Sequence, residues 1–160
     1  MTQGIACYLG LGGNLGEPAR LFDEVTRSLQ NNPLAEHVRE STRFESSPVD
    51  ATGPNYLNSV IELRWLGDAN QLLLACQALE NELGRVRSTR NAPRLIDVDV
   101  LLYGEQRINT PTLQVPHPRM HLRRFVLEPL VHLNPRVNIP GHGVASELLE
   151  HTRDQDVRAI

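Results

Sequence analysis

The sequence predicts an α+β domain in which helices pack on an antiparallel sheet. Four stretches have the length and apolar content of strands, and two segments between them carry apolar residues at helical spacing. The length of 160 residues favours one domain over 1–160, long enough to bury about 70% of its unfolded surface. The composition, 40% hydrophobic and 22% charged, is ordinary for a globular protein and excludes a fibrous repeat or a wholly disordered chain.

The first half of the expected order is strand, helix, strand. Residues 5–11 predict a buried strand, which the following Gly-Gly-Asn should end because these residues favour a positive φ. A helix is expected from Pro18, a residue that suits the first helical turn, with an apolar face over 21–29. Asn-Asn-Pro at 31–33 ends it, and residues 35–46 predict a second strand with mixed faces.

The second half repeats this order. Residues 46–55 hold two Pro, a Gly and two Ser and predict a loop, after which 56–65 alternate as a third strand. Asp68 and Gln71 form a capping-box-like pattern ahead of a helix that should stop at Gly84.

An apolar fourth strand is expected over 95–103, followed by turns and by helices near 122–132 and 144–151. The order βαββαβ matches the ferredoxin-like motif, with an antiparallel sheet and its helices on one face.

Charge and cysteine content exclude several classes of function. The net charge of −3 argues against bulk nucleic-acid binding, and no apolar run approaches the ~18 residues of a membrane span. The N-terminal residues lack the pattern of a signal peptide, so we expect a cytoplasmic protein. Cys7 and Cys76 are interpreted as two reduced core thiols, with a single disulfide as the alternative.

All sixteen Lys and Arg residues are Arg. A P-loop lysine and a lysine Schiff base are therefore excluded. If the protein binds phosphates, it does so with Arg side chains, backbone amides and metal ions.

Two Asp residues interrupt the fourth strand. Asp97 and Asp99 should share one face, since residues i and i+2 of a strand do, while their apolar neighbours face the core. Two carboxylates on an apolar strand are costly unless a positive group pairs with them. Salt bridges to nearby Arg residues are one interpretation. The other is a divalent cation, for which carboxylates without Cys or clustered His favour Mg²⁺.

Positive side chains gather in two places. Residues 85–94 contain four Arg and no acid, which predicts either a solvated basic loop or an anion-binding loop. His117 stands among Arg119, Arg123 and Arg124 as a second cluster, although a structural His is the simpler interpretation.

Polar pairs on two other elements could contact a ligand. Gln77 and Glu80 share a helix face, where exposed polar positions are the simpler interpretation. Tyr56 and Asn58 point to one face of the third strand and could hold a planar heterocycle. Residues 10–16 do not fit the dinucleotide-binding G-x-G-x-x-G pattern, and no acidic residue ends a second strand about twenty residues later.

Five motifs together resemble the 6-hydroxymethyl-7,8-dihydropterin pyrophosphokinase family. They are LGGNLG near the start, PNYLN at 54–58, GRVR at 84–87, NAPRLIDVD at 91–99 and VPHPRM at 115–120. Their order and spacing match the family over about residues 5–140. The resemblance implies a ferredoxin-like fold and transfer of pyrophosphate from ATP to the pterin hydroxymethyl oxygen, with release of AMP.

The resemblance also implies roles for individual residues. Asp97 and Asp99 would hold two Mg²⁺ ions, and Arg85 and Arg94 would stabilise the transferring group. The ATP site would comprise Gln77, Glu80, Arg87, His117 and Arg123. The pterin site would comprise Gly12, Ser46, Ser47, Val49, Tyr56, Asn58 and Phe125.

Three positions depart from the family pattern: Gly13 stands where Ser is frequent, Asn91 where some members have Trp, and Pro118 where some have Tyr. The expected partners are ATP and the pterin, with no nucleic acid and no membrane, and the protein is expected to act as a monomer. Two alternatives stay open at this point. One is a regulatory module that binds a nucleotide without chemistry, and the other is a structural protein in which the Asp and Arg residues only stabilise the sheet.

Overall fold

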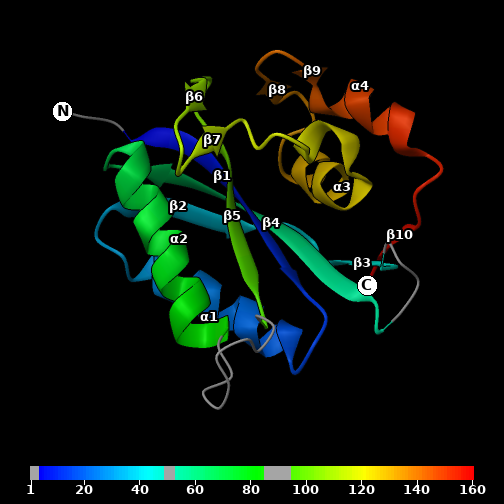
Figure 1. Cartoon of the computed structure of the whole chain (residues 1–160), viewed down its shortest axis with the longest axis horizontal. Coiled ribbons are helices and arrows are strands. Elements are labelled where there is room, and N and C mark those ends of the chain that lie inside the picture. The colour runs from blue at the N-terminus through cyan, green and yellow to red at the C-terminus, as the bar shows by residue number, and fades with distance from the viewer. Residues whose placement is uncertain (1–3, 49–52, 85–94) are drawn as a thin grey trace.

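The computed structural model describes residues 4–48, 53–84 and 95–160. Its centre is an antiparallel sheet with helices on both faces (Figure 1). The strands of this sheet are β1 (Ile5–Gly13), β2 (Ala35–Glu40), β3 (Phe44–Ser46), β4 (Tyr56–Trp65), β5 (Asp97–Tyr103) and β10 (Val157–Ala159). They follow the order β10-β3-β4-β1-β5, and β2 also pairs with β4. Since β1 lies between β4 and β5, the sheet has the predicted βαββαβ connectivity.

Two long helices cover one face of the sheet. The helix α1 (Pro18–Gln30) starts at the predicted proline and buries its apolar face, while α2 (Ala69–Gly84) follows the predicted capping box. The N–H of Gln71 donates to Oδ1 of Asp68 at 2.8 Å, and the N–H of Asp68 donates to Oε1 of Gln71 at 2.8 Å. Between these helices and the sheet lies the larger core, which includes the fully buried Phe22, Ile61 and Leu72.

The C-terminal third covers part of the other face, so the expectation of helices on one face only is wrong. Here lie η1 (Met120–Leu122), α3 (Arg124–Leu133), α4 (Ala145–Leu149) and η2 (Glu150–Thr152). Two small ladders complete the structure: β6 (Ile108–Asn109) with β7 (Gln114–Val115), which adds Val115 to the larger core, and β8 (Asn138–Ile139) with β9 (Gly143–Val144), which contacts α4. A second core joins Leu127 and Leu130 of α3 to Tyr8, Val60 and Leu101 of the sheet.

Two strand boundaries differ from the predictions. The segment 35–46 is two strands, because Ser41 lies between them and uses its N–H and its Oγ on the backbone of Val60. The first strand continues through Gly12 and Gly13, neither of which has a positive φ. A side chain is excluded at Gly13 for another reason: a Cβ there would lie 2.7 Å from the carbonyl oxygen of Leu95.

Cys7 and Cys76 are buried and unbridged, as predicted. Burial raises the pKa of the Cys7 thiol to about 12, so both the pKa and the lack of access make it an unreactive core residue. Among the helices of the described segments, none has the length and apolar character needed to cross a bilayer.

Candidate active site

A pocket of about 810 Å³ opens between the sheet and α3. Its floor includes Gly10 and Gly12 of β1, which lie on the same face of the strand as Tyr8. The helix α3 covers part of this face. The side chain of Tyr8 packs against the residues of α3, whereas the two glycines have no side chain to do so. A Cβ at Gly12 would lie 3.5 Å from Nδ2 of Asn58, so the missing side chain of Gly12 leaves bare backbone beside that amide.

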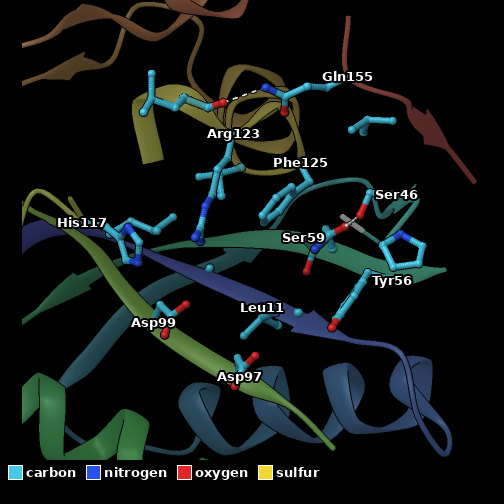
Figure 2. A pocket seen from close by; sticks show the side chains of 18 of the residues that line it. Leu11, Ser46, Tyr56, Ser59, Asp97, Asp99, His117, Arg123, Phe125 and Gln155 are labelled. Atoms are coloured by element: carbon cyan, nitrogen blue, oxygen red, sulfur yellow. Dashed lines mark hydrogen bonds between the residues drawn. The ribbon is translucent and has the colours of Figure 1, made fainter. Parts of the chain in front are cut away.

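Asp97 and Asp99 lie on the pocket side of β5 (Figure 2). Ladder pairing places Asp97 opposite Gly12 and Asp99 opposite Gly10, so the carboxylates lie beside the bare floor. Both residues are exposed, while Val98 between them is 3% exposed, as the predicted alternation requires. Because both carboxylates are exposed, most of the free-energy cost of burying two charges does not arise.

The donor set of this strand fits Mg²⁺. Within residues 4–48, 53–84 and 95–160, no three His, Cys, Asp or Glu side chains gather into a metal cage. Mg²⁺ does not need one, because it commonly takes one or two protein carboxylates and completes its octahedron with phosphate oxygens and water. Two exposed carboxylates that share one face of a strand supply such a partial set.

The end of the pocket near β3 and β4 carries flat and amide groups. The hydroxyl of Ser46 donates to Oδ1 of Asn58 at 2.5 Å, and both side chains are buried. This bond orients the amide and leaves Nδ2 of Asn58 to donate to a bound molecule. The rings of Tyr56 and Phe125 line the same space (Figure 2). This end suits a planar molecule with hydrogen-bonding edges.

The opposite wall is positively charged at Arg123 and carries His117 (Figure 2). The guanidinium of Arg123 lies 5.5 Å from the ring centroid of Phe125. Burial, followed by the charges of Arg123 and Arg119, lowers the pKa of His117. Since Nδ1 of His117 accepts the N–H of Arg119 at 3.2 Å, the neutral ring carries its proton on Nε2 and can donate it.

Arg124, the third Arg of the predicted cluster, does not line the pocket. It pairs with Glu128 at 2.6 Å and donates to the carbonyl of Thr152 at 3.3 Å, so it joins α3 to η2. Only part of the basic cluster around His117 therefore belongs to the site.

A second hollow of about 420 Å³ lies beside the first. Gln77 and Glu80 of α2 line it, together with residues 111–114 and Pro118. Glu80 is 6% exposed, and its carboxylate accepts the N–H of Val98 at 2.9 Å, which joins α2 to β5. Glu80 is therefore not the exposed polar residue of the simpler interpretation. Gln77 is exposed, as that interpretation expects. Asp97, Asp99 and His117 line both hollows and mark where the two meet.

The predicted site residues divide by whether the structure describes them. Val49, Arg85, Arg87 and Arg94 lie outside the described residues, as does Asn91. All the others line one hollow or both. Those lining only the first are Gly12, Ser46, Ser47, Tyr56, Asn58, Arg123 and Phe125.

Several lining residues were not predicted. Gly10 could have been found, because Gly10 and Gly12 leave two positions of one strand face without side chains. The segment 155–157 also lines the pocket, and β10, which begins at Val157, pairs with β3 across more than a hundred residues of sequence. No local pattern predicts a contact of that separation.

Comparison with known proteins gives consistent matches. Residues 8–135 match the family described as 7,8-dihydro-6-hydroxymethylpterin-pyrophosphokinase (HPPK). A 2-amino-4-hydroxy-6-hydroxymethyldihydropteridine pyrophosphokinase of Pseudomonas aeruginosa is 39% identical over 143 residues, which cover 89% of this chain and 88% of that protein. The Bacillus subtilis protein of the same name is 35% identical over 131 residues, 81% of this chain and 78% of its own length.

A solved structure of HPPK-DHPS in complex with substrates has a similar fold. Its TM-score to this chain is 0.75 at 11% sequence identity. The match covers 96% of this chain but 44% of that chain, so the present chain spans less than half of the larger protein. At this identity the likeness supports the predicted α+β fold alone.

Proposed function

The chain belongs to the 7,8-dihydro-6-hydroxymethylpterin-pyrophosphokinase family and transfers pyrophosphate from ATP to 6-hydroxymethyl-7,8-dihydropterin, and we propose that the two hollows described above bind its two substrates. The reaction releases AMP and is a step of folate biosynthesis. ATP is the co-substrate, generally with Mg²⁺ in this family. One observation carries the proposal: the two hollows meet at Asp97, Asp99 and His117.

The larger hollow is proposed to hold the pterin. Nδ2 of Asn58, oriented by Ser46, would donate to an edge of the heterocycle, and Tyr56 and Phe125 would contact its faces. The missing side chain of Gly12 leaves room for the ring beside Asn58. Ser47 and Val49 belong to the segment that would border the ring, and Val49 lies outside the described residues.

The smaller hollow is proposed to hold the nucleotide. Gln77 and Glu80 would border it, and the carbonyl and hydroxyl groups of 111–114 offer further partners. Arg123 and Nε2 of His117 would donate to the phosphate chain where the hollows meet. The predicted roles of Arg85, Arg87 and Arg94 at the phosphates remain predictions.

The reaction requires positioning and charge neutralisation more than a protein nucleophile. The pterin hydroxymethyl oxygen forms a bond to the β-phosphorus of ATP, and the bond from that phosphorus to the oxygen bridging to the α-phosphorus breaks. AMP leaves with that oxygen, and the hydroxyl proton is lost. Binding the pterin in one hollow and the phosphates at its junction with the other holds the two reacting groups together. Arg123, as a contact of the triphosphate, would help to stabilise its negative charge.

Asp97 and Asp99 are proposed to hold the Mg²⁺, and to hold two ions of it. Bound there, Mg²⁺ would supply positive charge to the phosphate oxygens and so favour attack of the hydroxymethyl oxygen on the β-phosphorus. The support from this chain is the pair of exposed carboxylates on one strand face. A single domain over 1–160 that acts as a monomer in the cytoplasm is part of the same proposal, and gel filtration tests the monomer.

A product assay tests the proposal. Purified protein is mixed with ATP, Mg²⁺ and the pterin, and nucleotides are separated by chromatography. We expect one AMP molecule for each pterin molecule consumed. No AMP should form when EDTA is added or when the pterin is left out. ADP as the product would contradict pyrophosphate transfer. ATP binding without any product would favour the regulatory module.

A further inference from the structure

The side chain of Gln155 bonds to the backbone on both sides of Arg123. Its Nε2 donates to the carbonyl of Leu122 at 2.8 Å, and its Oε1 accepts the N–H of Arg124 at 2.9 Å (Figure 2 draws the first bond). These are the two peptide groups that flank Arg123. A single planar amide therefore holds both of them.

This arrangement substitutes for a missing helix cap. Arg123 is the N-cap residue of α3, and its own side chain makes no capping hydrogen bond. The N–H of Arg124 is one of the first four of the helix, which have no partner inside it. Gln155 supplies that partner from more than thirty residues away in sequence. The backbone of Arg123 is extended, with φ −113° and ψ 112°, and the two bonds fix it there.

Fixing the backbone of Arg123 directs its side chain. The guanidinium lies over the ring of Phe125 and close enough to His117 to lower the pKa of that ring. Both hydrogen bonds of the Gln155 side chain are made to backbone groups beside Arg123, so the amide acts on the position of Arg123. Residue 155 is also anchored from the other side, because Asp156 accepts the hydroxyl of Ser47 at 3.2 Å and β10 pairs with β3.

We propose that Gln155 is a positioning residue for pyrophosphate transfer, which holds Arg123 in the orientation that contacts the phosphate chain. This rests on the proposed function of the pocket and adds to it a residue from the C-terminal segment. The segment thereby links the strand that borders the pterin end of the pocket to the start of α3.

A double-mutant cycle tests the proposal. Gln155→Met keeps the length of the side chain and removes both hydrogen bonds, and it is made with Arg123 present and in an Arg123→Ala background. The matched control is Arg153→Ala, in the same segment, whose side chain is 76% exposed and pairs with the exposed Glu150. Steady-state rates of AMP formation at varied ATP and circular dichroism are measured for each protein.

With Arg123 present, we expect Gln155→Met to lower kcat/KM for ATP about tenfold. In the Arg123→Ala background the same change should cost less than twofold, because the residue that Gln155 orients is gone. An equal loss in both backgrounds would show a merely structural role and overturn the proposal, as would no loss in either. If Gln155→Met fails to fold, Gln155→Glu, which keeps the acceptor for Arg124 and loses the donor, is used in the same cycle with the same expectation and the same refutation. The failure of the proposed function is distinct, since the wild type and Arg153→Ala would then form no AMP.

Discussion

Substituting Gly12 by alanine should impair pterin binding and spare the fold. Gly12 lies on the pocket floor in extended backbone, which alanine adopts without strain. The added methyl group would lie 3.5 Å from Nδ2 of Asn58, an ordinary van der Waals contact, so nothing in the protein must move. In a strand, replacing Gly by Ala should raise the free energy of unfolding slightly, by about 0.5–1 kcal/mol.

The same methyl group occupies the space that a ring needs in order to reach Nδ2 of Asn58. If the pterin loses this hydrogen bond, a buried donor is left without a partner in the complex, at a cost of about 1–3 kcal/mol. That range corresponds to a fall in pterin affinity of roughly 5- to 150-fold. ATP binds on the far side of the carboxylates in the proposed arrangement, so its KM should change little.

The assay is AMP formation at varied pterin and then at varied ATP, together with a thermal melt of each protein. The ATP KM is the internal control, and the melting temperature reports on folding. If Gly12→Ala changed pterin KM by less than twofold, the pterin would not lie over Gly12. An equal rise in both KM values would mean that the methyl group disturbs the whole site rather than its pterin end.

Three further predictions concern charge and stability. Replacing Asp97 or Asp99 by Asn should lower AMP formation at least 100-fold while the melting temperature stays within a few degrees, because both carboxylates are exposed; activity near that of the wild type would remove them from the metal site. Since the folded pKa of His117 is lowered, the ring should be neutral at pH 7, and the stability that this provides should be lost as the pH falls below about 6.5 towards the folded pKa. NMR titration of the ring should give a higher pKa in Arg123→Ala, and an unchanged value would mean that the charge of Arg123 does not contribute to lowering it. Asp68→Ala should reduce the free energy of unfolding by about 0.5–2 kcal/mol in a urea titration, with kcat unchanged; no loss of stability would mean that the capping bonds contribute nothing.

The parts of the fold that follow local rules could be predicted from the sequence. Alternation identified β4 residue for residue, and it placed Asp97 and Asp99 on one face with Val98 on the other. The capping box at Asp68 works as predicted because both of its hydrogen bonds join residues three apart. The described residues to which the resemblance gives a pterin or nucleotide role line the two hollows, and their roles there remain predictions.

The features that depend on distant pairing could not be predicted. Helices on the second face of the sheet follow from the packing of Leu127 and Leu130 against Tyr8 and Val60, and amphipathic helices do not say which face they will cover. The two hydrogen bonds of Gln155 join groups more than thirty residues apart in sequence. No hydrophobic periodicity identifies a single polar residue in a short C-terminal segment. The prediction that glycine would end the first strand was wrong for a related reason: a glycine can stay extended where a neighbour such as Leu95 leaves no room for Cβ.

The strand β5 stands at the end of the strand order, with the apolar stretch from Val100 to Tyr103 next to its two carboxylates. On this strand the N–H of Val98 donates to Glu80, and the carbonyl oxygen of Leu101 accepts the N–H of His117, so two backbone groups that could pair with a strand of another chain are already used. Charged side chains on an edge strand also oppose such pairing, and Asp97 and Asp99 give this edge two exposed carboxylates.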